Sequence, residues 1–138
     1  MKATLLALAI ALLMVGCGEE VYLNKLLDRN GTMYLPNEET PFTGRAKSFH
    51  RNGQKMGEVN FKDGKPHGLM TYWYENGQKE REANCKDGKE VSVEVWKPNG
   101  EKCPVTNWKD DNGVVVWYNE DGTERFRVTD KDGEIVRD

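Results

Sequence analysis

The sequence predicts an all-β protein made of consecutive β-hairpins, arranged as an elongated, twisted, single-layer antiparallel meander. The first observation is that short runs rich in aromatic and charged residues alternate with two-residue turn signals, as in residues 68–88, where Asn76-Gly77 is followed by Asp87-Gly88. A type I′ hairpin turn needs positive φ at both central residues, which Asn-Gly and Asp-Gly supply readily. This stretch is therefore expected to form strand, turn, strand and turn.

The second observation is that this unit repeats. Turn glycines recur every 22 to 24 residues, at Gly53, Gly77, Gly100 and Gly122. Four positions before each glycine stands an aromatic residue, in the order Phe49, Trp73, Trp96 and Tyr118. A single hairpin cannot bury its rings, whereas stacked hairpins can. The column of rings is therefore expected to form a cross-strand ladder with ring against ring.

Length and composition set limits on the class of protein. The 138 residues suffice for one domain, and Leu, Ile and Val are scarce after residue 35, so a thin core is expected. The formal charge is −3 with both signs interspersed, which argues against a nucleic-acid partner because such a surface needs clustered Lys and Arg.

The N-terminus has the pattern of an export signal. Lys2 precedes an apolar run over residues 5–15, which is shorter than the roughly 20 residues of a membrane-spanning helix. The run ends in Met14-Val15-Gly16-Cys17, which resembles a bacterial lipobox. The resemblance implies cleavage before Cys17 and acylation of its thiol, the side chain best suited to take up a glyceryl group. Durable anchoring needs more than one acyl chain, such as palmitate. The alternative is an ordinary cleaved signal with a chance cysteine.

These features divide the chain into three parts: a signal peptide at 1–16, a lipid anchor and tether at 17–23, and a repeat domain at 24–136. The protein is expected to be exported and lipid-anchored to the cell membrane, on the outer membrane in a Gram-negative host because Gly18 follows the cysteine. Residues 21–27 fit either a strand or one helical turn. Residues 32–35 fit a strand that Pro36 ends.

The repeat itself resembles a known family. Asn-Gly-Gln-Lys at 76–79, Lys-Asp-Gly-Lys at 86–89 and the His-Gly restart at 67–68 are similar to the bacterial variant of the MORN repeat. The resemblance covers about residues 24–136 and is degenerate at 91–112. It implies stacked hairpins and a role in scaffolding or membrane-proximal binding, without catalysis. Some such proteins are catalogued as antitoxins, a role that does not suit an exported protein facing a cytoplasmic toxin.

Catalytic, cofactor and metal sites are not predicted. Asp110-Asp111-Asn112-Gly113 and Asp130-Lys131-Asp132-Gly133 faintly resemble calcium loops, but no bidentate acid follows at the required spacing, so turn acids are the better interpretation. His50 and His67 have no cysteine or carboxylate at metal or triad spacing. The protein is therefore expected not to be an enzyme.

Two cysteines remain after the anchor. Export would favour a disulfide between Cys85 and Cys103, but a whole strand separates them, which puts them roughly 9–10 Å apart, whereas a disulfide needs Cα atoms within about 7 Å. A buried thiol is expected at Cys85, in the column that holds Phe61 and Trp108. Pairing between molecules stays open.

Six rings are candidate binding residues: Tyr72, Trp73, Tyr74, Trp96, Trp117 and Tyr118. They form either an exposed strip able to stack on sugars or contact a partner, or simply the core of a thin sheet. The expected function is a membrane-anchored, non-catalytic protein-interaction scaffold that binds membrane lipid through Cys17 and an envelope protein through its repeats. The alternative is a glycan or cell-wall binding module. Exposed sheet edges also allow oligomerisation by strand addition.

Overall fold

The computed structural model describes residues 18–136, in which the strands are joined by turns and loops and the one helical element is the single-turn 3-10 helix η1 (Leu23–Lys25). The predicted fold class, all-β with consecutive antiparallel strands, is confirmed. The predicted signal peptide and Cys17 lie outside the described residues. Within the described range, no helix has the length and apolar character needed to cross a membrane.

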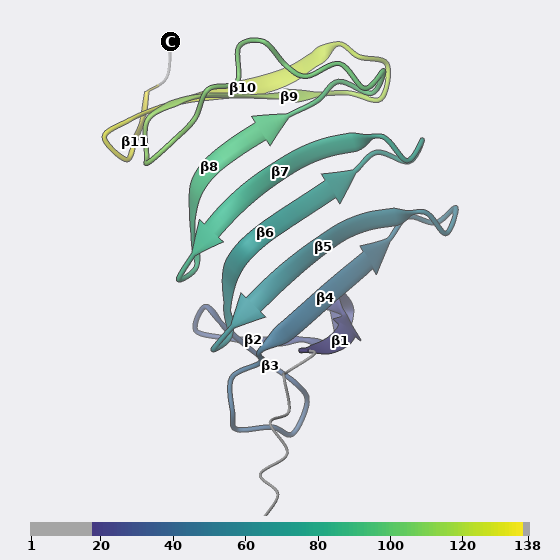
Figure 1. The fold of residues 1–138 in the computed structure, drawn as a ribbon, viewed down its shortest axis with the longest axis vertical. Coiled ribbons are helices and arrows are strands. Elements are labelled where there is room, and N and C mark those ends of the chain that lie inside the picture. Colours follow the sequence, from purple (N-terminus) through teal and green to yellow (C-terminus); the bar gives the residue numbers. More distant parts are fainter. Residues whose placement is uncertain (1–17, 137–138) are drawn as a thin grey trace, which may run out of the picture.

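The largest element is a six-stranded sheet with the order β1-β4-β5-β6-β7-β8 (Figure 1). Its strands are β1 (Glu19–Tyr22), β4 (Gly44–Phe49), β5 (Lys55–Lys62), β6 (Lys65–Trp73), β7 (Lys79–Lys86) and β8 (Lys89–Val95). Strands β4 to β8 form the expected antiparallel meander. Strand β1 pairs with β4 in parallel, with Glu19 opposite Gly44.

Strand β1 corrects the predicted tether at residues 17–23. Glu19–Tyr22 are part of the main sheet because they pair along their whole length with residues 44–47 of β4. Val21 packs against the apolar cluster around Ala46, while Tyr22 is exposed. Residues 21–27, for which the sequence allowed either a strand or one helical turn, contain the end of β1, then η1, and then the first residue of β2 (Leu27–Arg29).

Two smaller sheets flank the large one. Strands β2 (Leu27–Arg29) and β3 (Thr32–Tyr34) form a hairpin, and β9 (Gly113–Tyr118), β10 (Glu124–Lys131) and β11 (Glu134–Val136) form a sheet ordered β11-β10-β9. Figure 1 shows β9 and β10 beyond β8, turned edge-on to the view. The meander is thus interrupted in the degenerate unit at 91–112. Pro98 and Pro104 in this unit lack the N–H groups that a continuous ladder would use.

The hairpin turns are of two alternating kinds. Three Asp-Gly turns, at 63–64, 87–88 and 132–133, have positive φ at both residues, with 50° at Asp87 and 85° at Gly88, so the predicted type I′ turn is confirmed there. The prediction is wrong for Asn76-Gly77, where only the glycine has positive φ, at 82°. That loop is one residue longer, because Gly77 N–H donates to Tyr74 O and Tyr74 N–H to Gln78 O, both at 2.9 Å.

The asparagine side chain explains the longer loop. Asn76 Oδ1 accepts the N–H of Gln78 at 2.9 Å, an Asx turn that holds the residue out of the left-handed region. The same bond recurs at Asn52, Asn99 and Asp121. The dipeptide alone does not set the turn type, because Asp121-Gly122 forms this longer loop, whereas Asn30-Gly31 has positive φ at both residues, 56° and 77°.

The three type I′ Asp-Gly turns bind the preceding repeat. Each turn glycine donates its N–H to the carbonyl of the residue 22 positions earlier, at 2.8–2.9 Å: Gly64 to Phe42, Gly88 to Pro66 and Gly133 to Asp111. The N–H of the aspartate before the glycine also points towards the preceding repeat, since Asp63 N–H donates to Thr43 Oγ1 at 2.9 Å. Positive φ at both residues directs both amides towards the neighbouring turn.

The Asn-Gly loops are joined by side chains instead. Asn52 Nδ2 donates to Glu75 O at 2.9 Å, and Asn76 Nδ2 donates to Pro98 O at 2.8 Å. Asn99 makes the Asx turn, but its Nδ2 makes no corresponding bond to the next loop in the described structure. The amide ladder therefore ends where the meander is interrupted.

The apolar residues lie on one face of the large sheet, here called the inner face and marked by the cross-strand row Ala46, Val59, Met70, Ala83 and Val93. Residues from η1, β3 and their flanks cover one end of this face, around Phe42 and Phe61. Trp108 and strand β9 cover the other end, against Val93 and Val95. Neither core cluster includes the opposite face, here called the outer face.

The amide ladder gives a matched test. Asn76→Asp keeps the Oδ1 acceptor of the Asx turn but loses the donor to Pro98, so the free energy of unfolding is expected to fall by about 0.5–1.5 kcal/mol. Asn99→Asp removes no such bond and should leave stability within about 0.5 kcal/mol. Urea unfolding followed by circular dichroism measures both variants. Equal losses in both would contradict the assigned role of the Asn76 amide.

Candidate functional site

Tyr74 does not belong to an exposed strip. Its side chain is buried, at 3% exposure, and its hydroxyl donates to Trp96 O at 2.8 Å. Burial and the nearby Glu80 carboxylate raise the pKa of Tyr74, so the hydroxyl stays protonated and keeps this bond. Tyr74 is thus a core residue that joins one repeat to the next, which corrects its prediction as a binding residue.

Three more of the predicted rings lie apart from each other. Tyr72 is on the inner face, in register with Gly57 and Arg81. Trp117 stacks on Phe126 in the second sheet, with centroids 4.6 Å apart. The Tyr118 hydroxyl lies 3.0 Å from Cys103 Sγ, and burial together with this bond raises the pKa of Tyr118 to about 12. The six predicted residues therefore do not form one strip.

Trp73 and Trp96 do share the outer face, and lysines accompany them. Trp73 is in register with Lys79 on the neighbouring strand, and Trp96 is bridged to Lys102. Lys55 Nζ lies 5.0 Å from the centroid of Trp73. Together these residues make a row across the strands, here called the outer-face row: Lys55, Trp73, Lys79, Trp96 and Lys102.

Each lysine of the row lies between a ring and a carboxylate. Lys79 Nζ is 4.6 Å from the centroid of Trp96 and 2.6 Å from Glu82, and Lys55 Nζ is 2.9 Å from Glu58. Lys102 is 2.6 Å from Glu94 and 5.9 Å from the Trp96 centroid. Such cation–π contacts are worth about 0.5–1 kcal/mol each at exposed sites.

The predicted ladder of ring against ring is therefore wrong. The repeat spans two strands, so its rings stand on every second strand, about 9.6 Å apart, beyond the 4.5–7 Å range of ring pairs. A lysine fills each interval. Of the four rings in this column, Phe49 alone contacts another ring within residues 18–136, that of Tyr22 on the added strand β1, with centroids 5.9 Å apart. These two exposed rings are here called the edge pair.

Tyr22 and the three lysines were not among the predicted site residues. The lysines had a visible signal, since Lys55, Lys79 and Lys102 each follow a turn glycine by two positions. Tyr22 had none, because its exposure on the sheet depends on the parallel pairing of β1.

Cys85 and Cys103 are both buried and unpaired. Cys85 occupies the buried position expected from Phe61 and Trp108, and burial raises the pKa of its thiol. Burial acts in the same direction on Cys103, but hydrogen bonds with Thr106 and Tyr118 outweigh it and lower the pKa of that thiol.

The acidic turns and the histidines have structural partners. Asp111 O and Asn112 Oδ1 accept the turn amides of Gly133 and Asp132. His50 Nε2 lies 2.7 Å from Trp73 O, which joins two repeats. Residues 18–136 contain no group of three or more His, Cys, Asp or Glu placed to hold a metal ion.

These features define a β-hairpin repeat protein in which neighbouring units are joined at both ends of their strands. Residues 42–63 and 66–87 each match the family described as MORN repeat variant, so the chain carries two consecutive repeats of this type. The resemblance predicted from the turn motifs is confirmed for these two units. Repeats of this family are generally non-catalytic. Neither a curated protein nor a solved structure matches the chain significantly.

The row's contribution to stability can be measured. Lys79→Met keeps most of the aliphatic stem but removes the charge that contacts Trp96 and Glu82, so the free energy of unfolding should fall by about 0.5–1.5 kcal/mol. Lys86→Met, at an exposed position next to the Asp87-Gly88 turn, is the control and should change little. Urea titration monitored by tryptophan fluorescence would reveal the difference, and identical midpoints would contradict the proposed packing.

Glu80 provides a pH test. Burial, followed by the charge of Glu120, raises the pKa of the Glu80 carboxyl. A carboxyl whose pKa is higher in the folded state binds its proton more tightly there, so its ionisation opposes folding above that pKa and has no effect below the unfolded value. Glu80→Gln should therefore raise stability at pH 7 and change it little near pH 3.5. The exposed Glu101→Gln is the control, and a Glu80→Gln effect independent of pH would refute the assignment.

Proposed function

We propose that the chain is a lipid-anchored envelope protein that acts as a non-catalytic protein-interaction scaffold. The export pattern and lipobox at residues 1–17 support the anchor. The observation that carries the scaffold role is the outer face of the large sheet, which neither core cluster covers and which carries the outer-face row.

The chemistry of the row suits a protein partner. Aromatic rings are enriched at the centre of protein interfaces, and lysine stems extend the apolar area beside them. The row's charges are already paired, because Lys55, Lys79 and Lys102 each contact a glutamate. A partner can therefore dock without supplying the opposite charge, and the contact is expected to depend little on salt.

The packing also bears on the glycan alternative. Sugars stack on the open face of an aromatic ring, but lysine ammonium groups lie over the Trp73 and Trp96 rings. To stack on either ring, a sugar would have to displace the ion-paired lysine that lies over it. Protein contact through ring edges and lysine stems needs no such displacement, which favours the scaffold role.

The test is a crosslinked pull-down of the membrane-anchored protein, with bound molecules read by mass spectrometry. A stoichiometric envelope protein is expected with the unmodified chain, and the variant Lys79→Glu/Lys102→Glu should recover at least about tenfold less, since it reverses two charges beside Trp96. Lys86→Glu/Lys89→Glu makes the same charge change away from the row and is the matched control. Cys17→Ala is the unanchored control.

Circular dichroism establishes that each variant is folded. Equal recovery with both double variants would reject the outer-face row as the contact surface. Recovery of cell-wall fragments in place of a protein would replace the scaffold with glycan binding.

A further inference from the structure

The backbone just after Cys17 is fixed directly on the sheet. A Cβ added at Gly18 would lie 3.0 Å from Gly44 Cα, and one added at Gly44 would lie 2.2 Å from Glu19 O and 2.8 Å from Phe42 Cζ. Only two glycines allow the backbones to approach this closely. Strand β1 then begins at Glu19, so residues 18–22 have no length of free chain.

The close packing of Gly18 on Gly44 limits the distance between the domain and a lipid anchor at Cys17. If Cys17 is acylated, which rests on the proposed function, one peptide unit of about 3.8 Å separates the acylated residue from Gly18. The N-terminal end of strand β1 must then lie at the membrane surface. A lipid anchor with a flexible spacer would impose no such constraint.

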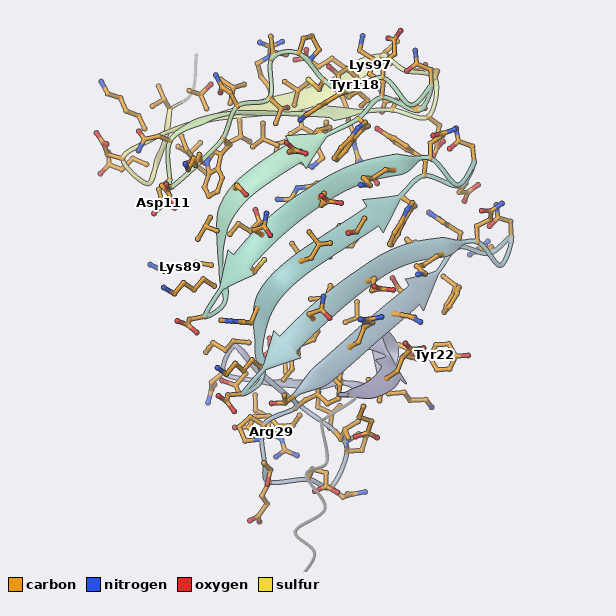
Figure 2. The ribbon with its side chains drawn as sticks, viewed as in Figure 1. Tyr22, Arg29, Lys89, Lys97, Asp111 and Tyr118 are labelled. Atoms are coloured by element: carbon orange, nitrogen blue, oxygen red, sulfur yellow. The ribbon has the colours of Figure 1, made fainter. Side chains whose placement is uncertain are left out.

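The edge pair stands on strand β1, which carries Tyr22, and on the neighbouring strand β4, which carries Phe49. Tyr22 is 60% exposed and Phe49 is 43% exposed, and both stand at the β1 side of the outer face. Figure 2 shows the Tyr22 ring projecting away from the sheet at the margin of the molecule. Tyr22 follows Gly18 by four residues along the strand, or about 13 Å. Exposed aromatic rings at this distance from an acyl chain suit the boundary between lipid headgroups and hydrocarbon.

The lysine beside Tyr22 is paired with a carboxylate. Lys47, in register with Tyr22, forms a salt bridge of 2.6 Å with Glu20. Hydrogen bonding to this lysine lowers the pKa of Glu20, so the pair remains ionised and neutral overall near pH 7. Contact at this edge is therefore expected to depend on ring insertion and not on anionic lipid.

We propose that the β1 edge is the bilayer-facing surface of the domain, with Tyr22 and Phe49 inserted at the boundary between headgroups and acyl chains. Strand β1 lies outside the two matched repeats. The bilayer contact is thereby separate from the outer-face row, which the fixed edge holds in a constant orientation to the membrane.

The test uses a deliberately weak anchor. A single myristoyl-length chain is coupled through a maleimide to the Cys17 thiol of the mature chain, residues 17–138, since one such chain gives only marginal membrane binding. Partitioning into phosphatidylcholine vesicles is then measured by sedimentation. The variant Tyr22→Ser/Phe49→Ser is expected to lower the partition coefficient by about tenfold.

The matched control is Phe126→Ser/Ile135→Ser, which removes two exposed apolar side chains from the second sheet and should change partitioning by less than about twofold. Vesicles with added phosphatidylglycerol should give the same drop for the edge-pair variant. Circular dichroism confirms folding of each protein. Equal partitioning of the edge-pair variant and the unmodified chain, or equal losses in both double variants, would overturn the proposal.

Because the anchor is supplied chemically, this result is independent of lipidation in the cell. The intact mass of protein extracted from membranes tests that lipidation separately. A mass without acyl chains would reject the proposed anchor, while the partition measurement would still decide whether the edge pair contacts lipid.

Discussion

The fold depends on the hydrogen bonds from the type I′ Asp-Gly turns to the preceding repeat. Gly64, Gly88 and Gly133 all reach a carbonyl 22 positions earlier, so the bond couples the length of the unit to the stacking of turns. An inserted residue between two turns would move the amide away from its carbonyl. The bond requires a left-handed aspartate before the glycine, with φ of 50° at Asp63 and Asp87. Aspartate tolerates this conformation better than most residues, and it occupies this position at Asp63, Asp87 and Asp132.

The side-chain arrangement follows from that period. Two strands per unit place equivalent residues about 9.6 Å apart, which is too far for rings to touch and suitable for one intervening lysine. Each lysine then contacts a ring and a glutamate, as Lys79 contacts Trp96 and Glu82. The individual contributions are small because the groups are partly exposed. Repeated between neighbours along the sheet, they add approximately as nearest-neighbour terms, which is how repeat proteins accumulate stability.

The sequence predicted what is local and periodic. The hairpins, the Asp-Gly turns and the degenerate unit could be read from spacing alone. The turn at Asn76-Gly77 was mistaken because the asparagine side chain bonds to its own backbone, an alternative that the dipeptide does not reveal. Strand β1 was mistaken for a tether because its parallel pairing depends on a distant contact between Gly18 and Gly44. The six candidate rings separated onto different surfaces because successive residues of a strand, such as Tyr72 and Trp73, point to opposite faces, and because Trp117 and Tyr118 belong to the second sheet.

The parts of the chain outside the matched repeats close the sheet that the repeats leave open. A meander of hairpins ends in two edge strands with unpaired backbone groups, which invite pairing with other chains. Strand β1 covers the β4 edge, and its parallel direction means that another hairpin of the same kind cannot simply continue the stack. At the other end, Val93 N–H donates to Trp108 O at 3.2 Å and Cys103 N–H donates to Val95 O at 2.7 Å, so the degenerate unit covers the β8 edge. The large sheet ends here because the degenerate unit has lost the repeat pattern. A regular unit would extend the ladder of backbone hydrogen bonds. Residues 96–112 instead bend away and bring β9 beneath the inner face, against Val93 and Val95.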